Sequence, residues 1–228
     1  MSVMQESTVQ RYALEFLRRR YRWVAWGGKI FAEPEVRTKP EYGGKRADGL
    51  VAYHHWILGT TVVSMEAKSR KTMPAIRPYP DRLQRWRNSL WAGLLISVVA
   101  GGGSALYRMD EPLFRYGMPL LFFVLGTLLY FFLTAKHYGH YQLTVVAQVG
   151  FYPGNRRWLA VSADSLDHLR KQDKAKILQQ ICRSHGIGLL EVYPGGRVCV
   201  RTGARRTWWP GRIYLRRYLR YPEIQAYI

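Results

Sequence analysis

Three side chains in the N-terminal third combine the groups that hydrolysis of a phosphodiester requires. They are the carboxylates of Asp48 and Glu66 and the amine of Lys68. Such hydrolysis has to neutralise charge that builds on phosphorus and to make a nucleophile from water at neutral pH. Two carboxylates and a main-chain carbonyl can hold Mg²⁺, which prefers oxygen ligands and keeps several waters. The amine would orient the attacking water or help to deprotonate it.

The spacing of these residues predicts that they meet at one end of a small sheet. Alternation along residues 60–68 places Glu66 and Lys68 on the same face of a strand. Asp48 precedes an apolar strand, 49–53, which could pair antiparallel with the first across a short connection. A lone Glu-x-Lys arises about once by chance in a chain of this length. The motif therefore depends on this context, and the alternative is a solvated ion pair at a strand edge.

Hydrophobic periodicity predicts the elements that would position these groups. A helical repeat predicts an amphipathic helix over residues 6–20, and alternation predicts three strands after it. Beyond residue 140, apolar runs and turn residues predict two strands, a helix and a closing hairpin. The predicted strands are 29–37, 49–56, 60–68, 142–151, 157–161, 188–193 and 197–201, and the second helix is 166–184.

This arrangement resembles the PD-(D/E)xK nuclease superfamily, in which a helix precedes a β-meander, Asp begins the second strand and (D/E)xK lies on the third. The matching residues here are Ala47-Asp48 and Glu66-Ala67-Lys68. Archaeal Holliday-junction resolvases and restriction-type enzymes also carry a Glu in the first helix, a place that Glu6 fits better than Glu15. The resemblance covers residues 5–70 well and 142–201 loosely, and it departs where Ala47 replaces the usual Pro.

The resemblance implies an α/β, restriction endonuclease-like αβββαβ core and a deoxyribonuclease that depends on Mg²⁺ or Mn²⁺. Asp48, Glu66 and Lys68 would be the catalytic residues. Asp48 and Glu66 would bind the metal, Ala67 would offer its main-chain carbonyl, and Glu6 would assist a second ion.

Charge and hydropathy predict a membrane anchor within this core. The 228 residues include 35 Lys plus Arg and 15 Asp plus Glu, so the net charge of +20 favours nucleic acid or anionic lipid as a partner. Residues 90–106 and 116–135 contain no charged side chain. They predict a transmembrane helical hairpin, with two buried helices of a soluble core as the alternative.

The distribution of charge predicts an orientation for this hairpin. The net charge is +9 over residues 1–88 (17 basic, 8 acidic), zero over 107–115 (two of each) and +11 over 136–228 (16 basic, 5 acidic). Basic flanks resist translocation, so both termini are expected in the cytoplasm of a multi-pass inner-membrane protein.

The predicted organisation is therefore a nuclease core in two parts, 1–88 and 137–203, around a hairpin at 89–136, followed by a basic aromatic tail at 204–228. The tail suits either phosphate contact with base stacking or anchoring at lipid headgroups. Its candidate contact residues are Arg205, Arg206, Trp208, Trp209, Arg212, Arg216 and Arg217.

Together these features predict a membrane-anchored nuclease that hydrolyses DNA at the cytoplasmic face, in defence against foreign DNA such as phage, as a homo-oligomer or with a protein partner. Two alternatives stay open. One is a catalytically silent basic membrane protein that binds nucleic acid or anionic lipid, and the other is a structural subunit of a membrane complex.

Overall fold

The computed structural model describes residues 3–25, 28–57, 59–106, 117–134, 137–207 and 209–228. The chain forms two compact units. The larger contains Met1–Pro78 and Leu143–Ile228, and the smaller contains Tyr79–Gln142. The fold is α/β, with a mixed sheet in the larger unit.

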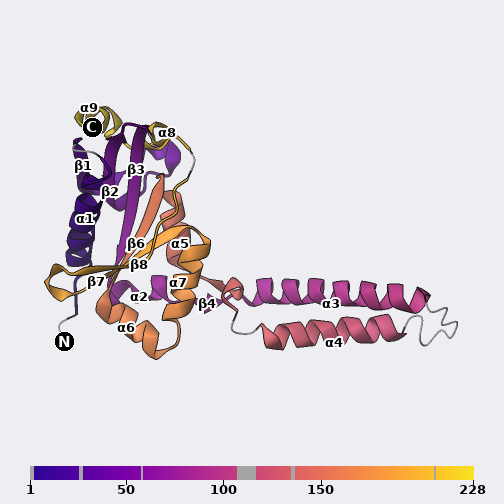
Figure 1. The fold of residues 1–228 in the computed structure, drawn as a ribbon. Helices are drawn as coiled ribbons and strands as arrows, with labels where there is room; N and C mark the ends of the chain where they lie inside the picture. Colours follow the sequence, from indigo (N-terminus) through magenta and orange to yellow (C-terminus); the bar gives the residue numbers. More distant parts are fainter. Residues whose placement is uncertain (1–2, 26–27, 58, 107–116, 135–136, 208) are drawn as a thin grey trace. The chain divides into compact units, whose positions relative to one another are not determined.

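The sheet of the larger unit has six strands in the order β1-β2-β3-β6-β7-β8 (Figure 1). The first three form an antiparallel meander, β6 and β7 continue parallel to β3, and β8 is antiparallel to β7. The strands are β1 Ile30–Arg37, β2 Arg46–His55, β3 Gly59–Lys68, β6 Arg156–Ser162, β7 Ile187–Val192 and β8 Val198–Thr202.

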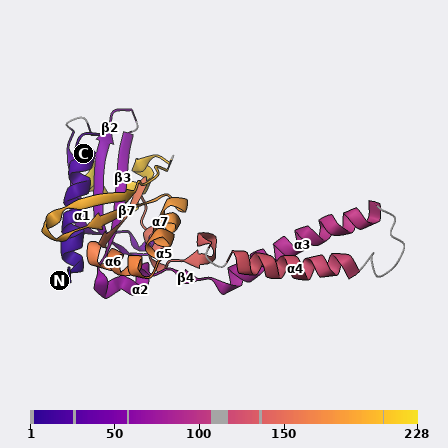
Figure 2. The ribbon, with the colours of Figure 1, turned by 60° about the horizontal axis from the view of Figure 1, so that its bottom comes forward.

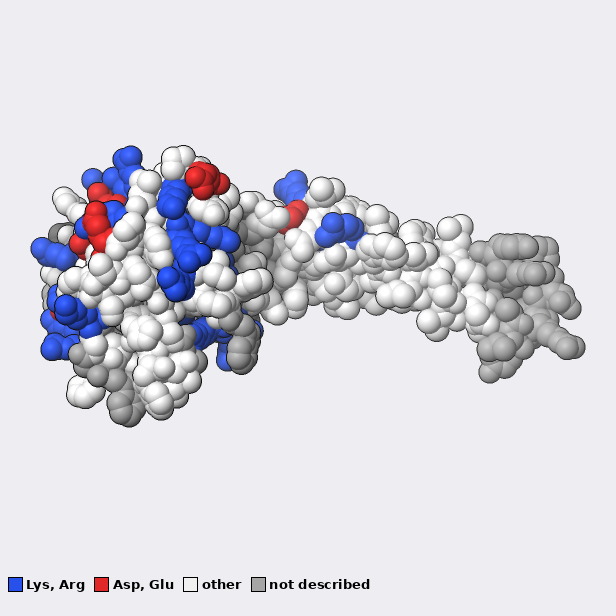
Figure 3. Space-filling view, turned by 90° about the horizontal axis from the view of Figure 1, so that it is seen from above, with Lys and Arg blue, Asp and Glu red and all other residues white. Residues whose placement is uncertain are grey.

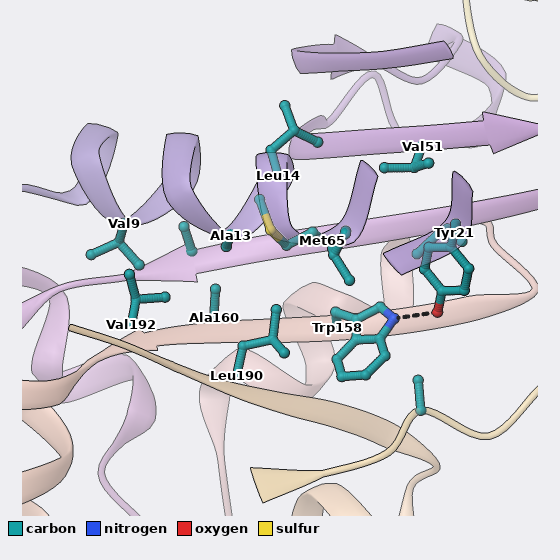
Figure 4. Packing of buried hydrophobic residues seen from close by; sticks show 14 of the residues in the cluster. Val9, Ala13, Leu14, Tyr21, Val51, Met65, Trp158, Ala160, Leu190 and Val192 are labelled. Carbon is teal, nitrogen blue, oxygen red and sulfur yellow. Dashed lines mark hydrogen bonds between the residues drawn. The ribbon is translucent and has the colours of Figure 1, made fainter. Parts of the chain in front are cut away.

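Helix α1, Glu6–Arg22, covers one face of this sheet (Figure 4). Its apolar residues recur at helical spacing and form a single buried stripe. They pack against apolar side chains of β2, β3, β6 and β7. Within this core the indole Nε1 of Trp158 donates a hydrogen bond of 3.0 Å to the hydroxyl of Tyr21. The buried residues of α1 are Val9, Ala13, Leu14, Leu17 and Tyr21.

The other face is covered by short helices, so the unit has three layers (Figure 2). Over β1, β2 and β3 lies a second apolar cluster, to which the chain's last residues contribute Leu215, Tyr218 and Ile224, all fully buried. The remaining helices are α2 Met73–Ile76, α5 Thr144–Phe151, α6 Ala163–Lys171, α7 Ala175–Ser184, α8 Gly211–Leu215 and α9 Tyr221–Tyr227.

Two predicted elements of the larger unit are wrong. Residues 142–151, predicted as a strand, are mostly helix α5, in which Val145 and Val149 are buried one turn apart. A short apolar run of β-branched residues does not distinguish the two structures, and packing decides between them. Residues 166–184, predicted as one helix, belong to α6 and α7, between which Asp173 takes a left-handed conformation with φ 56°.

The smaller unit is a helical hairpin of α3, Arg82–Leu106, and α4, Met118–Leu133. Strands β4, Tyr79–Pro80, and β5, Tyr141–Gln142, pair at its base. The helices approach closely at Gly93, where a Cβ atom would lie 2.0 Å from Oγ1 of Thr127. Many large apolar side chains on this hairpin are exposed, among them Leu95, Val99, Leu120, Phe132 and Leu133.

The predicted transmembrane hairpin is wrong for the part of the chain that the structure describes, because none of the helices there is both long and apolar enough to cross a membrane. Helix α4 has 16 residues, or about 24 Å, against a hydrocarbon core of about 30 Å. Helix α3 has 25 residues, but it begins with Arg82, Arg85 and Arg87. The inner-membrane location and the orientation inferred from this hairpin lose their basis with it. The linker used to orient it, 107–115, lies outside the described residues.

The packing of Trp158 on Gly188 provides a test of the core. A Cβ atom at residue 188 would lie 2.2 Å from Cε3 of Trp158, so Gly188→Ala should lower the free energy of unfolding by about 1–3 kcal/mol through overpacking. Gly203→Ala is the control, because a Cβ there meets nothing within 4 Å. Urea unfolding measures both variants, and equal free energies would contradict the packing described.

Candidate active site

The pairing of β2 with β3 places Asp48 beside the Glu66-Ala67-Lys68 segment. Gly49 pairs with Met65, so one step further along the antiparallel ladder Asp48 lies opposite Glu66. The amide of Ala67 donates a hydrogen bond of 2.8 Å to Oδ2 of Asp48. The register therefore brings both carboxylates to the same end of the sheet.

The amine of Lys68 lies between two carboxylates. Its Nζ is 2.6 Å from Oε1 of Glu66 and 3.5 Å from Oε1 of Glu6, which belongs to the first turn of α1. Both partners in the shorter pair are almost completely buried, with 9% of the Lys68 side chain and 6% of the Glu66 side chain exposed. The hydroxyl of Thr72 donates a hydrogen bond of 2.6 Å to the other oxygen of Glu6. Strand β3 and helix α1 thus converge on one ammonium group.

Burial and the charge of a neighbouring carboxylate disfavour the charged forms of the acids. Burial is the main reason why the pKa of Asp48 and that of Glu66 are raised, and the charge of Asp48 raises the pKa of Glu66 further. Burial alone would lower the pKa of Lys68, but the hydrogen bond and charge of Glu66, with the charges of Glu6 and Asp48, raise it overall. Lys68 is therefore held as a cation.

Another carboxylate in the same sheet is buried and has its charge balanced by neighbouring cations. Glu191 on β7 is completely buried and forms ion pairs with two guanidinium groups, 2.9 Å from Arg170 and 2.5 Å from Arg201. Glu66 and Glu6 share the single amine of Lys68, and Asp48 forms no ion pair with it among the described residues, although the charge of the amine acts on the Asp48 carboxylate. The acids at the end of β2 and β3 therefore have fewer cationic partners than Glu191 has.

One carboxylate oxygen at this end is buried without a hydrogen bond of normal geometry to any described residue. It is Oε2 of Glu66, and Oε1 of Glu191 is in the same situation despite its nearby arginines. The phenol of Tyr152 interacts with Glu66. Burial is the main cause that raises the pKa of Tyr152, and the charges of Glu66 and Asp48 raise it further. A cation would satisfy the unpaired oxygen and reduce the repulsion between Asp48 and Glu66.

The available side chains fit a hard cation that needs few protein ligands. Within the described residues, no group of three or more His, Cys, Asp and Glu side chains is arranged to hold a metal ion. Mg²⁺ is commonly held by one or two carboxylates while it keeps several waters. Asp48 and Glu66 meet that requirement, whereas the carbonyl of Ala67 as a ligand and Glu6 as the aid to a second ion stay predictions.

The structure thus brings four of the residues singled out in the sequence to one place, namely Glu6, Asp48, Glu66 and Lys68. Glu15 is not among them, since it pairs with Arg18 and Arg19 on the surface.

Sequence reasoning missed two residues at this place. Gln10 donates from Nε2 to the main-chain carbonyl of Asp48, and its position one helical turn after Glu6 was a usable signal. Tyr152 had no such signal, because it follows a segment predicted to be a strand.

The predicted basic tail is part of the fold and does not project from it. Asn155 connects it to the sheet, because its side chain accepts from the amide of Val62 at 2.9 Å and donates to the carbonyl of Trp209 at 2.7 Å. Arg212 and Arg216 are exposed, Arg217 is half-buried, and Trp209 is largely exposed. Trp208 lies outside the described residues. Arg205 is also tied to the fold, since its amide donates to the carbonyl of Gly186. Arg206 is half-buried.

No protein-family model matches the chain, and neither the curated proteins nor the solved structures include one with significant similarity to it. The resemblance to the nuclease superfamily therefore rests on the residues and geometry described above.

The buried ion pair between Lys68 and Glu66 leads to a prediction about stability. In metal-free buffer, Lys68→Met should lower the free energy of unfolding by about 3 kcal/mol, because it leaves buried carboxylates without their cation. The double variant Lys68→Met with Glu66→Gln should lose less than the sum of the single variants. Urea unfolding with EDTA measures this cycle, with the exposed Lys71→Met as the control. Additive losses would mean that Lys68 and Glu66 are not coupled.

Proposed function

We propose that this chain is a metal-dependent nuclease of the PD-(D/E)xK type that hydrolyses phosphodiester bonds of DNA. The observation that carries the proposal is the convergence of Asp48, Glu66 and Lys68 at one end of β2 and β3, where burial raises the pKa of both acids. A structural ion pair needs only one carboxylate, whereas two carboxylates beside an amine provide two oxygen ligands for a divalent cation. Perturbed carboxylates gathered with an amine are typical of sites that perform acid–base and metal chemistry.

Each residue has a role that follows from its position. Asp48 and Glu66 would hold Mg²⁺ or Mn²⁺, which supplies Lewis acidity and lowers the pKa of bound water. Lys68 donates hydrogen bonds and positive charge where charge develops on the phosphate and the nucleophile. Glu6 and Thr72 keep the amine in place from the side of α1. The excess of basic residues in the chain provides the attraction for a polyanion.

The earlier expectation of a role in defence at a membrane came from the predicted hairpin, and it loses its basis with that hairpin. The rival that remains is a catalytically silent basic protein that binds nucleic acid or anionic lipid. Cleavage in Mg²⁺ but not in EDTA distinguishes the two.

Metal binding is the first test. Mg²⁺ should stabilise the folded protein, by about 2.7 kcal/mol at one hundred times its Kd, because the unfolded chain lacks the site. Asp48→Ala with Glu66→Ala should abolish this gain, whereas the control Glu15→Ala with Glu41→Ala, which removes one half-exposed and one exposed carboxylate, should keep it. Calorimetry and thermal unfolding measure the effect. Equal binding by both double variants would place the metal elsewhere.

Catalysis by Lys68 is the second test. Lys68→Met should lower the rate of DNA cleavage about a hundredfold to a thousandfold, because the lost group acts on charge that develops in the transition state. DNA affinity should change little, since one of 35 basic side chains is removed. Rates are compared at saturating DNA, with circular dichroism to confirm equal folding and Lys71→Met as the control. Cleavage at the wild-type rate would refute the proposed role of Lys68.

A further inference from the structure

A small pocket beside the candidate active site contains two arginines without acidic partners. Its volume is about 130 Å³, and its wall includes Tyr152, Gly154, Arg157, Thr207 and Arg217. Both residues are half-buried, and neither forms an ion pair with a carboxylate of the described residues. Bringing two cations together in a partly dehydrated place is unfavourable unless an anion joins them.

The surroundings of the pocket add positive charge and aromatic rings. The guanidinium of Arg217 lies 5.0 Å from the ring centre of Tyr42 and 5.9 Å from that of Tyr214. Nζ of Lys45 lies over the ring of Phe151, which also lines the pocket. As a feature of the larger unit as a whole, Figure 3 shows Lys and Arg side chains gathered in a stripe on one face, which favours attraction of a polyanion.

The volume limits the group that can enter. Pockets for drug-sized molecules begin at about 300 Å³, so this pocket is smaller than those. It has room for a group of the size of a phosphate. The fork of a guanidinium group and the hydroxyl of Thr207 match the oxygens of a phosphate.

The position of the pocket connects it to the candidate active site. Tyr152 lines the pocket, and its phenol interacts with Glu66. Gly154 lies against Ser64, since a Cβ there would be 3.0 Å from the serine Oγ. Ser64 precedes Glu66 by two residues, or about 7 Å along β3, and faces the same way. The pocket is therefore one side chain away from the two carboxylates.

We propose that the pocket between Arg157 and Arg217 is a phosphate subsite that holds a backbone phosphate of DNA close to the phosphodiester that is cleaved. This inference rests on the proposed nuclease function for the cleaved bond, whereas the anion site rests on the pocket itself. Bound there, the phosphate fixes the position of the strand relative to Asp48, Glu66 and Lys68.

Binding in EDTA tests the subsite without cleavage. A short fluorescein-labelled DNA duplex is titrated with wild type, with Arg157→Gln plus Arg217→Gln, and with the control Arg22→Gln plus Arg183→Gln, two exposed arginines on α1 and α7. All are full-length and checked by circular dichroism. The pocket pair should weaken binding at least about tenfold more than the control pair, and its slope of log affinity against log salt should be smaller by about 0.9, the value of one phosphate contact.

A charge-preserving variant and a modified DNA separate a specific contact from general attraction. Arg157→Lys plus Arg217→Lys should still lose part of the affinity, because an ammonium group lacks the planar fork. Replacing single phosphates by uncharged methylphosphonates should weaken wild type at one backbone position, and the Gln variant should not respond to that replacement.

The outcomes distinguish the subsite from the nuclease. Equal losses in the pocket pair and the control pair, or no methylphosphonate effect specific to wild type, would overturn the subsite even if Mg²⁺ supports cleavage. Arginine-dependent binding without any cleavage in Mg²⁺ would leave the phosphate subsite in place and overturn the nuclease function. Both effects together, with the sensitive phosphate close to the cleaved bond, support the full proposal.

Discussion

The charge balance around Lys68 is the constraint on which the candidate active site depends. Its ammonium is bound to Glu66 and close to Glu6, and its charge also acts on Asp48. One cation thus offsets the burial of Glu66 and acts on two partly buried acids. In the proposed nuclease, a divalent cation would add the positive charge that this arrangement lacks. The charge of Glu191, by contrast, is balanced by two guanidinium partners.

The sheet and α1 make this balance possible because they hold the acids on separate elements. Strand pairing sets Asp48 opposite Glu66, and a slip of one residue would turn every side chain of the strand to the other face. The buried stripe of α1 aligns the helix on the sheet, and this alignment brings its first turn, with Glu6, to the end of β3. Apolar packing on one face thus positions charged groups at the end of the sheet.

The C-terminal residues complete the fold and supply the cations beside the site. Leu215 and Tyr218 are buried over β1–β3, so the backbone that carries Arg217 is held in place. The guanidinium of Arg217 lies near the rings of Tyr42 and Tyr214. The loop before β6 does the same for Arg157, because Asn155 ties that loop to β3. Net charge attracts a polyanion without fixing where it binds. Two anchored arginines in a small pocket would fix the position of one phosphate group.

The sequence by itself determined the elements with strong local signals. The stripe of α1, the alternation of β2 and β3, and the Asp48, Glu66 and Lys68 pattern can all be inferred from residue spacing, because periods of 3.6 and 2 are local properties. It did not determine whether an apolar segment becomes a strand, a helix or a membrane span. Residues 144–151 became a helix through packing, and the described part of the hairpin contains no helix long and apolar enough for a membrane.

Only the tertiary structure decided which distant residues share a site. Tyr152 interacts with Glu66 from the segment before β6, which pairs in parallel with β3. Arg157 and Arg217 line one pocket with Tyr152 because the last helices pack back on the sheet. These residues lie far apart in the sequence, and no periodic pattern encodes their proximity. The chain carries the chemistry in a short local motif, and long-range packing sets the charge, the burial and the pocket that surround it.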